Sequence, residues 1–139
     1  MHLRFYPGLE DADLDSEYDA AKGNVGKELK DLSKRYKDVY LKVKAFFRKL
    51  KDTKDLDEYK KAEEIFQFPG TDLFEMRIPK QRRGGVFRIY FCFSLEDGKT
   101  EDLILLDAEF KHKKEPMRLN AAKAKLKEYY KSFGKEART

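Results

Sequence analysis

Three strand-like runs between residues 73 and 110 constrain the fold of this chain more than any other feature. In each run, apolar and polar side chains alternate with the period of two that is typical of a β-strand. The two sides of the first run are formed by Phe74, Met76 and Ile78 and by Glu75 and Arg77. The alternation predicts a sheet with one apolar face and one face that carries arginine.

The second and third runs repeat this division. Their apolar sides consist of Phe87, Ile89, Phe91 and Phe93 and of Ile104, Leu106, Ala108 and Phe110. Their polar sides carry Arg88 and Tyr90 in the second run and Asp107 and Glu109 in the third. We therefore expect these polar side chains to share one face with Glu75 and Arg77.

Helical periodicity flanks the strands. Apolar residues recur at spacings of three and four from Val25 to Leu50, and their register shifts between Ser33 and Asp38, which predicts two consecutive helices with a break between them. We expect a short third helix over residues 55–66 and a terminal helix after Pro116. With a short strand over residues 2–6, this order predicts an α+β fold: a helical hairpin on one face of a small antiparallel sheet, followed by a C-terminal helix.

Charge is distributed unevenly along the chain. A length of 139 residues predicts one domain over residues 1–139. The formal net charge of +5 favours an anionic partner. Residues 10–19 hold six acidic residues and no basic residue, so the rest of the chain is more basic than its total suggests. We predict an acidic, irregular segment over about residues 7–23 that could fold back over the basic face.

Several classes of protein are disfavoured by the sequence. A single cysteine, Cys92, excludes an internal disulfide and is expected to be a small buried hydrophobic residue. No Cys/His cluster has metal-ligand spacing and no glycine-rich phosphate loop is present, so we expect neither a metal nor another cofactor. Without a long apolar run or a signal-peptide pattern, the chain is expected to avoid membranes and to be cytoplasmic.

The strands contain an ordered set of short motifs: Phe74-Glu75-Met76-Arg77, then Phe87-Arg88-Ile89-Tyr90, then Leu105-Leu106 and Phe110-Lys111-His112-Lys113. Together with the helical hairpin before them and the Ala/Lys-rich helix after them, they resemble the RelE/HigB-like toxins of bacterial type II toxin–antitoxin systems, especially the phage-derived HigB-like branch. The similarity covers roughly residues 24–133. It implies a RelE-like fold and a toxin that cleaves messenger RNA in the ribosomal decoding site.

RNA cleavage by its own 2′-hydroxyl needs a base, an acid and positive charge around the phosphate. Arg77 and Arg88 are on neighbouring strands and could hold one phosphate between their guanidinium groups. The candidates for the base are His112, Glu75 and Glu109, and those for the acid are Lys111 and Lys113.

Further residues are expected to bind RNA. Tyr90 could stack on an unpaired base. The basic candidates are Lys80, Arg82 and Arg83 in the hairpin and Lys111, Lys114 and Arg118 near the last helix. The expected partners are the ribosome, messenger RNA and a small antitoxin, most simply a helix-turn-helix protein, that covers the arginine face.

Two other functions and a purely structural interpretation stay open. The same fold could serve a ParE-like gyrase inhibitor, or a relative without catalytic activity that binds RNA or protein. The acidic residues Asp107 and Glu109 favour the inactive relative, because they could neutralise Arg77 and Arg88 inside the protein. Tyr90 could equally well pack under the last helix.

Overall fold

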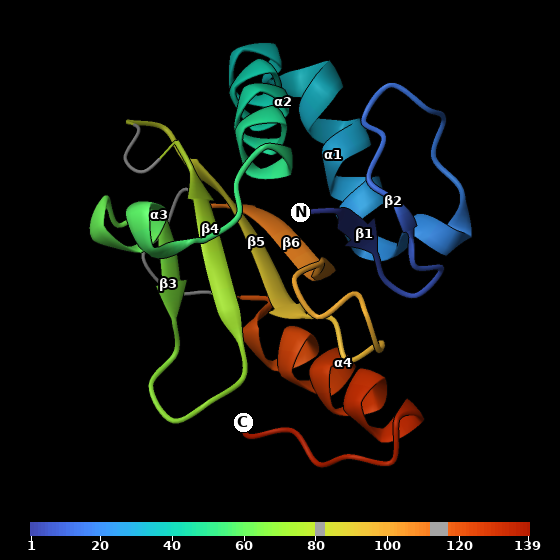
Figure 1. Cartoon of the computed structure of the whole chain (residues 1–139). Coiled ribbons are helices and arrows are strands. Elements are labelled where there is room, and N and C mark those ends of the chain that lie inside the picture. Colours follow the sequence, from blue (N-terminus) through green and yellow to red (C-terminus); the bar gives the residue numbers. More distant parts are fainter. Residues whose placement is uncertain (80–82, 112–116) are drawn as a thin grey trace.

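A mixed β-sheet forms the centre of the protein in the computed structural model, which describes residues 1–79, 83–111 and 117–139 (Figure 1). Within these residues the sheet has six strands in the order β2-β1-β6-β5-β4-β3. The strands are β1 (Leu3–Phe5), β2 (Glu10–Asp11), β3 (Ile65–Gln67), β4 (Phe74–Ile78), β5 (Val86–Phe93) and β6 (Leu103–Lys111). Strand β1 runs parallel to β6, while the other neighbouring strands are antiparallel. The prediction of a purely antiparallel sheet was therefore wrong for β1, since a strand's residue pattern does not reveal its direction.

Along the chain, the helices lie between the second and third strands and after the last strand. They are the short 3-10 helix η1 (Ala20–Lys22), α1 (Gly23–Arg35), α2 (Lys37–Lys51), α3 (Asp57–Lys61) and α4 (Leu119–Ser132). The predicted break between the first two helices is confirmed, because Tyr36 has φ −135° and ψ 65° and ends α1. The third helix is shorter than predicted, since Ile65–Gln67 pairs with β4 as strand β3.

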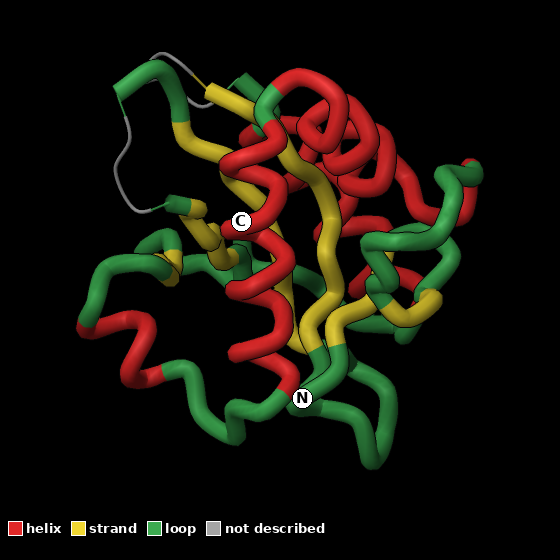
Figure 2. The backbone as a smooth tube through the Cα atoms, turned by 90° about the horizontal axis from the view of Figure 1, so that it is seen from above, coloured by secondary structure: helices red, strands yellow, loops and turns green. Residues whose placement is uncertain are grey.

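Helices bury both faces of the sheet. Figure 2 shows the backbone from above, with the helices in red and the strands in yellow. On one face, α1 and α2 contribute Leu29, Val43 and Phe47 to a core with Phe87 and Ile89. The expected exposed face is instead covered by α4, whose buried residues Ala122, Leu126 and Tyr129 pack against Tyr90, Cys92, Ile104 and Leu106. The prediction of a single apolar face was therefore wrong, because Cys92 and the aliphatic residues of β6 provide a second one.

A register shift between β5 and β6 changes the faces predicted for β6. Tyr90 lies opposite Asp107, whereas the next residue, Phe91, lies opposite Leu105. Leu106 is therefore an extra residue in β6, a β-bulge that interrupts the alternation. As a result Leu106 lies on the α4 face together with Asp107, whereas the sequence pattern predicted opposite faces for these two residues.

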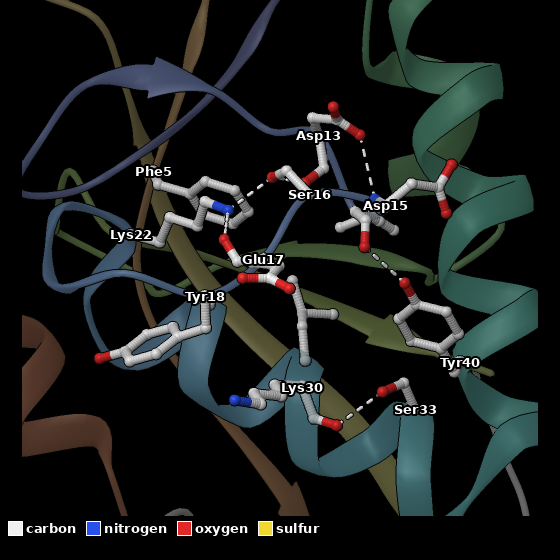
Figure 3. Close-up of a pocket in the computed structure, with 13 residues that line it drawn as sticks. Phe5, Asp13, Asp15, Ser16, Glu17, Tyr18, Lys22, Lys30, Ser33 and Tyr40 are labelled. Carbon is white, nitrogen blue, oxygen red and sulfur yellow. Dashed lines mark hydrogen bonds between the residues drawn. The ribbon is translucent and has the colours of Figure 1, made fainter.

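The acidic N-terminal segment packs against α1 and α2 (Figure 3). It is less irregular than predicted, since it includes both β2 and η1. The hydroxyl of Tyr40 donates a hydrogen bond to the carbonyl of Leu14 at 2.6 Å, and Lys44 Nζ lies 2.6 Å from Asp15 Oδ1. A cavity of about 430 Å³ remains between this segment and α1. The lysines at this contact, Lys22, Lys30 and Lys44, lie on η1, α1 and α2, not on the arginine-bearing strands.

The helices also bear on the membrane expectation. Over the parts of the chain that the structure describes, none of them combines the length and the apolar character needed to span a bilayer.

Candidate functional site

The predicted polar side chains gather where β4, β5 and β6 run side by side on the α4 face of the sheet. The strand register forms two neighbouring cross-strand rows, Arg77–Arg88–Glu109 and Glu75–Tyr90–Asp107. The expected shared face is thus present at this end of the sheet. We call this set of residues, together with Lys111, Arg118 and Lys125, the charged cluster.

Glu75 links the two arginines that the sequence singled out. Its buried carboxylate accepts a hydrogen bond from Arg77 Nε at 2.5 Å, and its other oxygen lies 3.7 Å from Arg88 Nη1. The Arg77 side chain is 41% exposed, whereas that of Arg88 is only 13% exposed. Nε of Arg88 is buried and has no hydrogen-bond partner among the described residues. Glu75 therefore orients a pair of cations, one accessible and one partly unsatisfied.

Glu109 fastens the start of α4 to β6. One carboxylate oxygen accepts hydrogen bonds from the Tyr90 hydroxyl at 2.9 Å and from the backbone N–H of Arg118 at 2.8 Å. The other oxygen accepts a hydrogen bond from the backbone N–H of Met117 at 3.1 Å and lies 3.6 Å from Lys111 Nζ. The Lys111 ammonium group is buried, and residues 1–79, 83–111 and 117–139 supply no hydrogen-bond partner for it. Because its oxygens are occupied in this way, Glu109 acts as a structural acceptor.

Tyr90 is fully buried beneath α4, which confirms the packing alternative for this residue. Burial raises the pKa of its phenol, and the hydrogen bond to Glu109 raises it further, so the hydroxyl stays a neutral donor. Its ring packs in the apolar cluster under α4 and cannot stack on an RNA base in this structure. Tyr90 is therefore not among the residues that we expect to contact RNA.

Asp107, on β6, links this strand to α1 and to α4. Its buried carboxylate accepts a hydrogen bond from the Asn24 amide at the start of α1, and another from the backbone N–H of Ala108. From the α4 side, Arg118 donates through Nε at 3.3 Å and Nη2 at 2.9 Å, and Lys125 Nζ donates at 2.9 Å. Burial alone would raise the pKa of Asp107, but the hydrogen bonds from Arg118, Lys125 and Asn24 outweigh it and lower the pKa.

The balance of charge in the cluster is positive. Among the described residues, three buried carboxylates face five basic side chains, those of Arg77, Arg88, Lys111, Arg118 and Lys125. Arg77 and Arg118 are the accessible members, at 41% and 42% exposure. A positive site with low-dielectric walls concentrates anions near it. The arrangement is therefore suited to holding a phosphate group.

The structure brings together seven of the predicted site residues: Glu75, Arg77, Arg88, Tyr90, Glu109, Lys111 and Arg118. Arg83 lies exposed in the turn before β5. The remaining candidates, Lys80, Arg82, His112, Lys113 and Lys114, lie outside the described residues.

Two partners of Asp107, Asn24 and Lys125, were not predicted from the sequence. The spacing of seven residues between Arg118 and Lys125 could have placed both on one side of the last helix. No sequence signal could have found Asn24, because its contact with Asp107 joins residues far apart in the chain.

Metal ligands are a separate question from the charged cluster. Within the described ranges no group of three or more His, Cys, Asp or Glu side chains is arranged to hold a metal ion.

Comparison of the chain with protein-family models, with curated proteins and with solved structures finds no match among them.

Proposed function

We propose that this protein is a RelE/HigB-like toxin of a type II toxin–antitoxin system that cleaves messenger RNA on the ribosome. The observation that carries the proposal is the excess of cations in the charged cluster. Arg77 and Arg88 are cross-strand neighbours, and Arg88 and Lys111 each have a buried donor atom for which the described part of the chain supplies no hydrogen-bond partner. An unsatisfied buried donor is costly, so its presence beside accessible arginines favours a role in binding an anion.

The order of elements also supports the proposal. Helices α1 and α2 precede the antiparallel β4–β5–β6 ladder, and α4 follows it. This is the order that the resemblance to RelE/HigB-like toxins implies, although the acidic N-terminal segment is longer than the usual start of that family.

The chemistry that we propose needs no cofactor. The arginines hold the phosphate while the 2′-oxygen attacks phosphorus and the bond to the 5′-oxygen breaks, which leaves a 2′,3′-cyclic phosphate and a free 5′-hydroxyl. One group accepts the 2′-hydroxyl proton and another donates a proton to the 5′-oxygen. Since Glu75 and Glu109 are engaged by donors of the protein, and Lys111 is buried beside Glu109, we assign the base to His112 and the acid to Lys113.

The proposed partners follow from this activity. The protein would act in the cytoplasm on ribosomes carrying messenger RNA, and its basic surfaces would contact ribosomal RNA backbone. A small antitoxin, most simply a helix-turn-helix protein, would cover Arg77 and Arg88 and so prevent RNA from reaching the phosphate site.

The test is cleavage of messenger RNA on purified ribosomes, with 5′ ends mapped by primer extension. The wild-type chain should cut the message, and Arg77→Ala and Arg88→Ala should each lower the cleavage rate by about 10²-fold. Arg138→Ala is the matched control. Arg138 lies in the C-terminal tail, and it pairs with Asp72 outside the charged cluster. Cleavage at the wild-type rate by both cluster variants would refute the assignment. Intact messenger RNA together with a DNA-damage response in cells would favour the gyrase inhibitor.

A second candidate function is RNA binding without cleavage. The observation that favours it is that Glu75, Asp107 and Glu109 are all buried and paired with basic groups of the cluster, so that part of its positive charge is neutralised within the protein. Binding of RNA that weakens with salt, with the message left intact on ribosomes, would select this function.

A further inference from the structure

Arg118 is held to β6 through both its backbone and its side chain. Its backbone N–H donates to Glu109, and its guanidinium group donates to both oxygens of Asp107. The side chain is nevertheless 42% exposed, while the Asp107 side chain is fully buried. A guanidinium group has more N–H donors than this contact uses, so Arg118 keeps donors for an external anion.

We propose that Asp107 is a positioning residue that holds the Arg118 guanidinium group in place to bind an RNA phosphate. This inference rests on the proposed function, because it concerns the same charged cluster. Asp107 is suited to the role since Asn24 from α1 and Lys125 from α4 fix the carboxylate from other directions. The carboxylate is therefore a rigid support for a side chain that would otherwise lose considerable rotamer freedom on binding.

Asp107→Asn separates this role from simple neutralisation. Removing one negative charge beside the cluster makes the protein more positive, and on charge alone a polyanion should bind more tightly. A positioning role predicts the opposite. The folded variant should bind a short single-stranded RNA oligonucleotide roughly three- to tenfold more weakly, with a smaller dependence of affinity on salt.

Asp72→Asn is the matched control, since Asp72 accepts two hydrogen bonds from the Arg138 guanidinium group and lies outside the cluster. It removes the same charge, and its affinity for RNA should equal or slightly exceed that of the wild type. In an Arg118→Ala background, Asp107→Asn should cause no further loss of affinity, because the group that it positions is gone.

Arg118→Lys provides a measurement that does not depend on the folding of the Asp107 variant. Lysine keeps the charge but lacks the planar fork, so positioning predicts a loss close to that of Arg118→Ala, whereas a pure charge role predicts wild-type affinity. Equal or tighter RNA binding by folded Asp107→Asn, or wild-type binding by Arg118→Lys, overturns the inference and leaves the proposed function intact. If the wild-type chain binds no RNA, the proposed function fails and the inference fails with it.

Discussion

Two aspartates that each bind a lysine, Asp107 under α4 and Asp15 on the N-terminal segment, differ in almost every other respect. Asp107 is fully buried and accepts hydrogen bonds from side chains of α1 and α4. The Asp15 side chain is 72% exposed and contacts Lys44 on α2 at 2.6 Å. An ion pair therefore organises a fold only when it is removed from water, where an unpaired charge becomes costly.

The largest effect should follow from Asp107→Ala, which removes the buried carboxylate that Asn24, Arg118 and Lys125 share as their acceptor. We expect a loss of about 3–5 kcal/mol in the free energy of unfolding, measured by urea denaturation. Asp72→Ala is the control, and it should cost less because its partner Arg138 is 66% exposed. Equal losses from both substitutions would contradict the distinction between buried and exposed pairs.

Acidification should produce the next largest effect, since several carboxylates titrate together. Burial alone would raise the pKa of Asp107 and Asp72, but hydrogen bonds from basic groups lower it, and the hydrogen bond from Lys44 lowers the pKa of Asp15. A pKa lowered by folding means that the stabilisation is present above the unfolded value of about 4 and is lost as pH falls through the folded value. Urea denaturation from neutral to strongly acidic pH should therefore show a decline that begins below about pH 4.

The decline with acid should be smaller in Asp107→Asn than in the wild type, because this variant has no carboxyl group to protonate at that position. Identical pH profiles for the two proteins would show that Asp107 does not contribute to the acid sensitivity.

A smaller effect is expected from Glu109→Gln. The amide replaces one acceptor oxygen by a donor, which must then face the backbone N–H of Met117 or the Tyr90 hydroxyl and Arg118 N–H. We expect a loss of about 1–3 kcal/mol by urea denaturation. Glu128→Gln is the matched control, since Glu128 accepts a hydrogen bond from Tyr6 at an exposed position. The interpretation of Glu109 as a structural acceptor fails if both substitutions are equally well tolerated.

The smallest effect should follow from Asp15→Asn. Its contact with Lys44 is open to water, and the carbonyl of Leu14 still accepts a hydrogen bond from Tyr40. The melting temperature should stay within error of the wild type at moderate salt. A clear loss of stability would mean that this exposed pair, too, organises the fold.

The helices of this protein could be predicted well because their signal is local. The break at Tyr36 follows from a shift of register between two apolar stripes, and the buried face of α4 follows from the spacing of Ala122, Leu126 and Tyr129. The sheet was harder to predict. The extra residue Leu106 and the parallel direction of β1 depend on partner strands that are distant in the sequence.

The candidate site divides in the same way. Alternation within single strands was enough to place Glu75, Arg77 and Arg88 on one face, where they do lie together. The burial of Tyr90 and the use of Glu109 as an acceptor could not be predicted, because both depend on how α4 returns over β6.

The helical segments, the polar side of each central strand and the excess of basic residues could be predicted from the sequence, because each of these properties depends on residues close together in the chain. Which charges are neutralised and which stay accessible depends on the tertiary structure. Asn24, Asp107, Arg118 and Lys125 come from three different elements, and their mutual contacts exist only once α1 and α4 have packed on opposite faces of the sheet. The strength of a charge interaction depends on burial and on distance, and neither can be read from the order of residues.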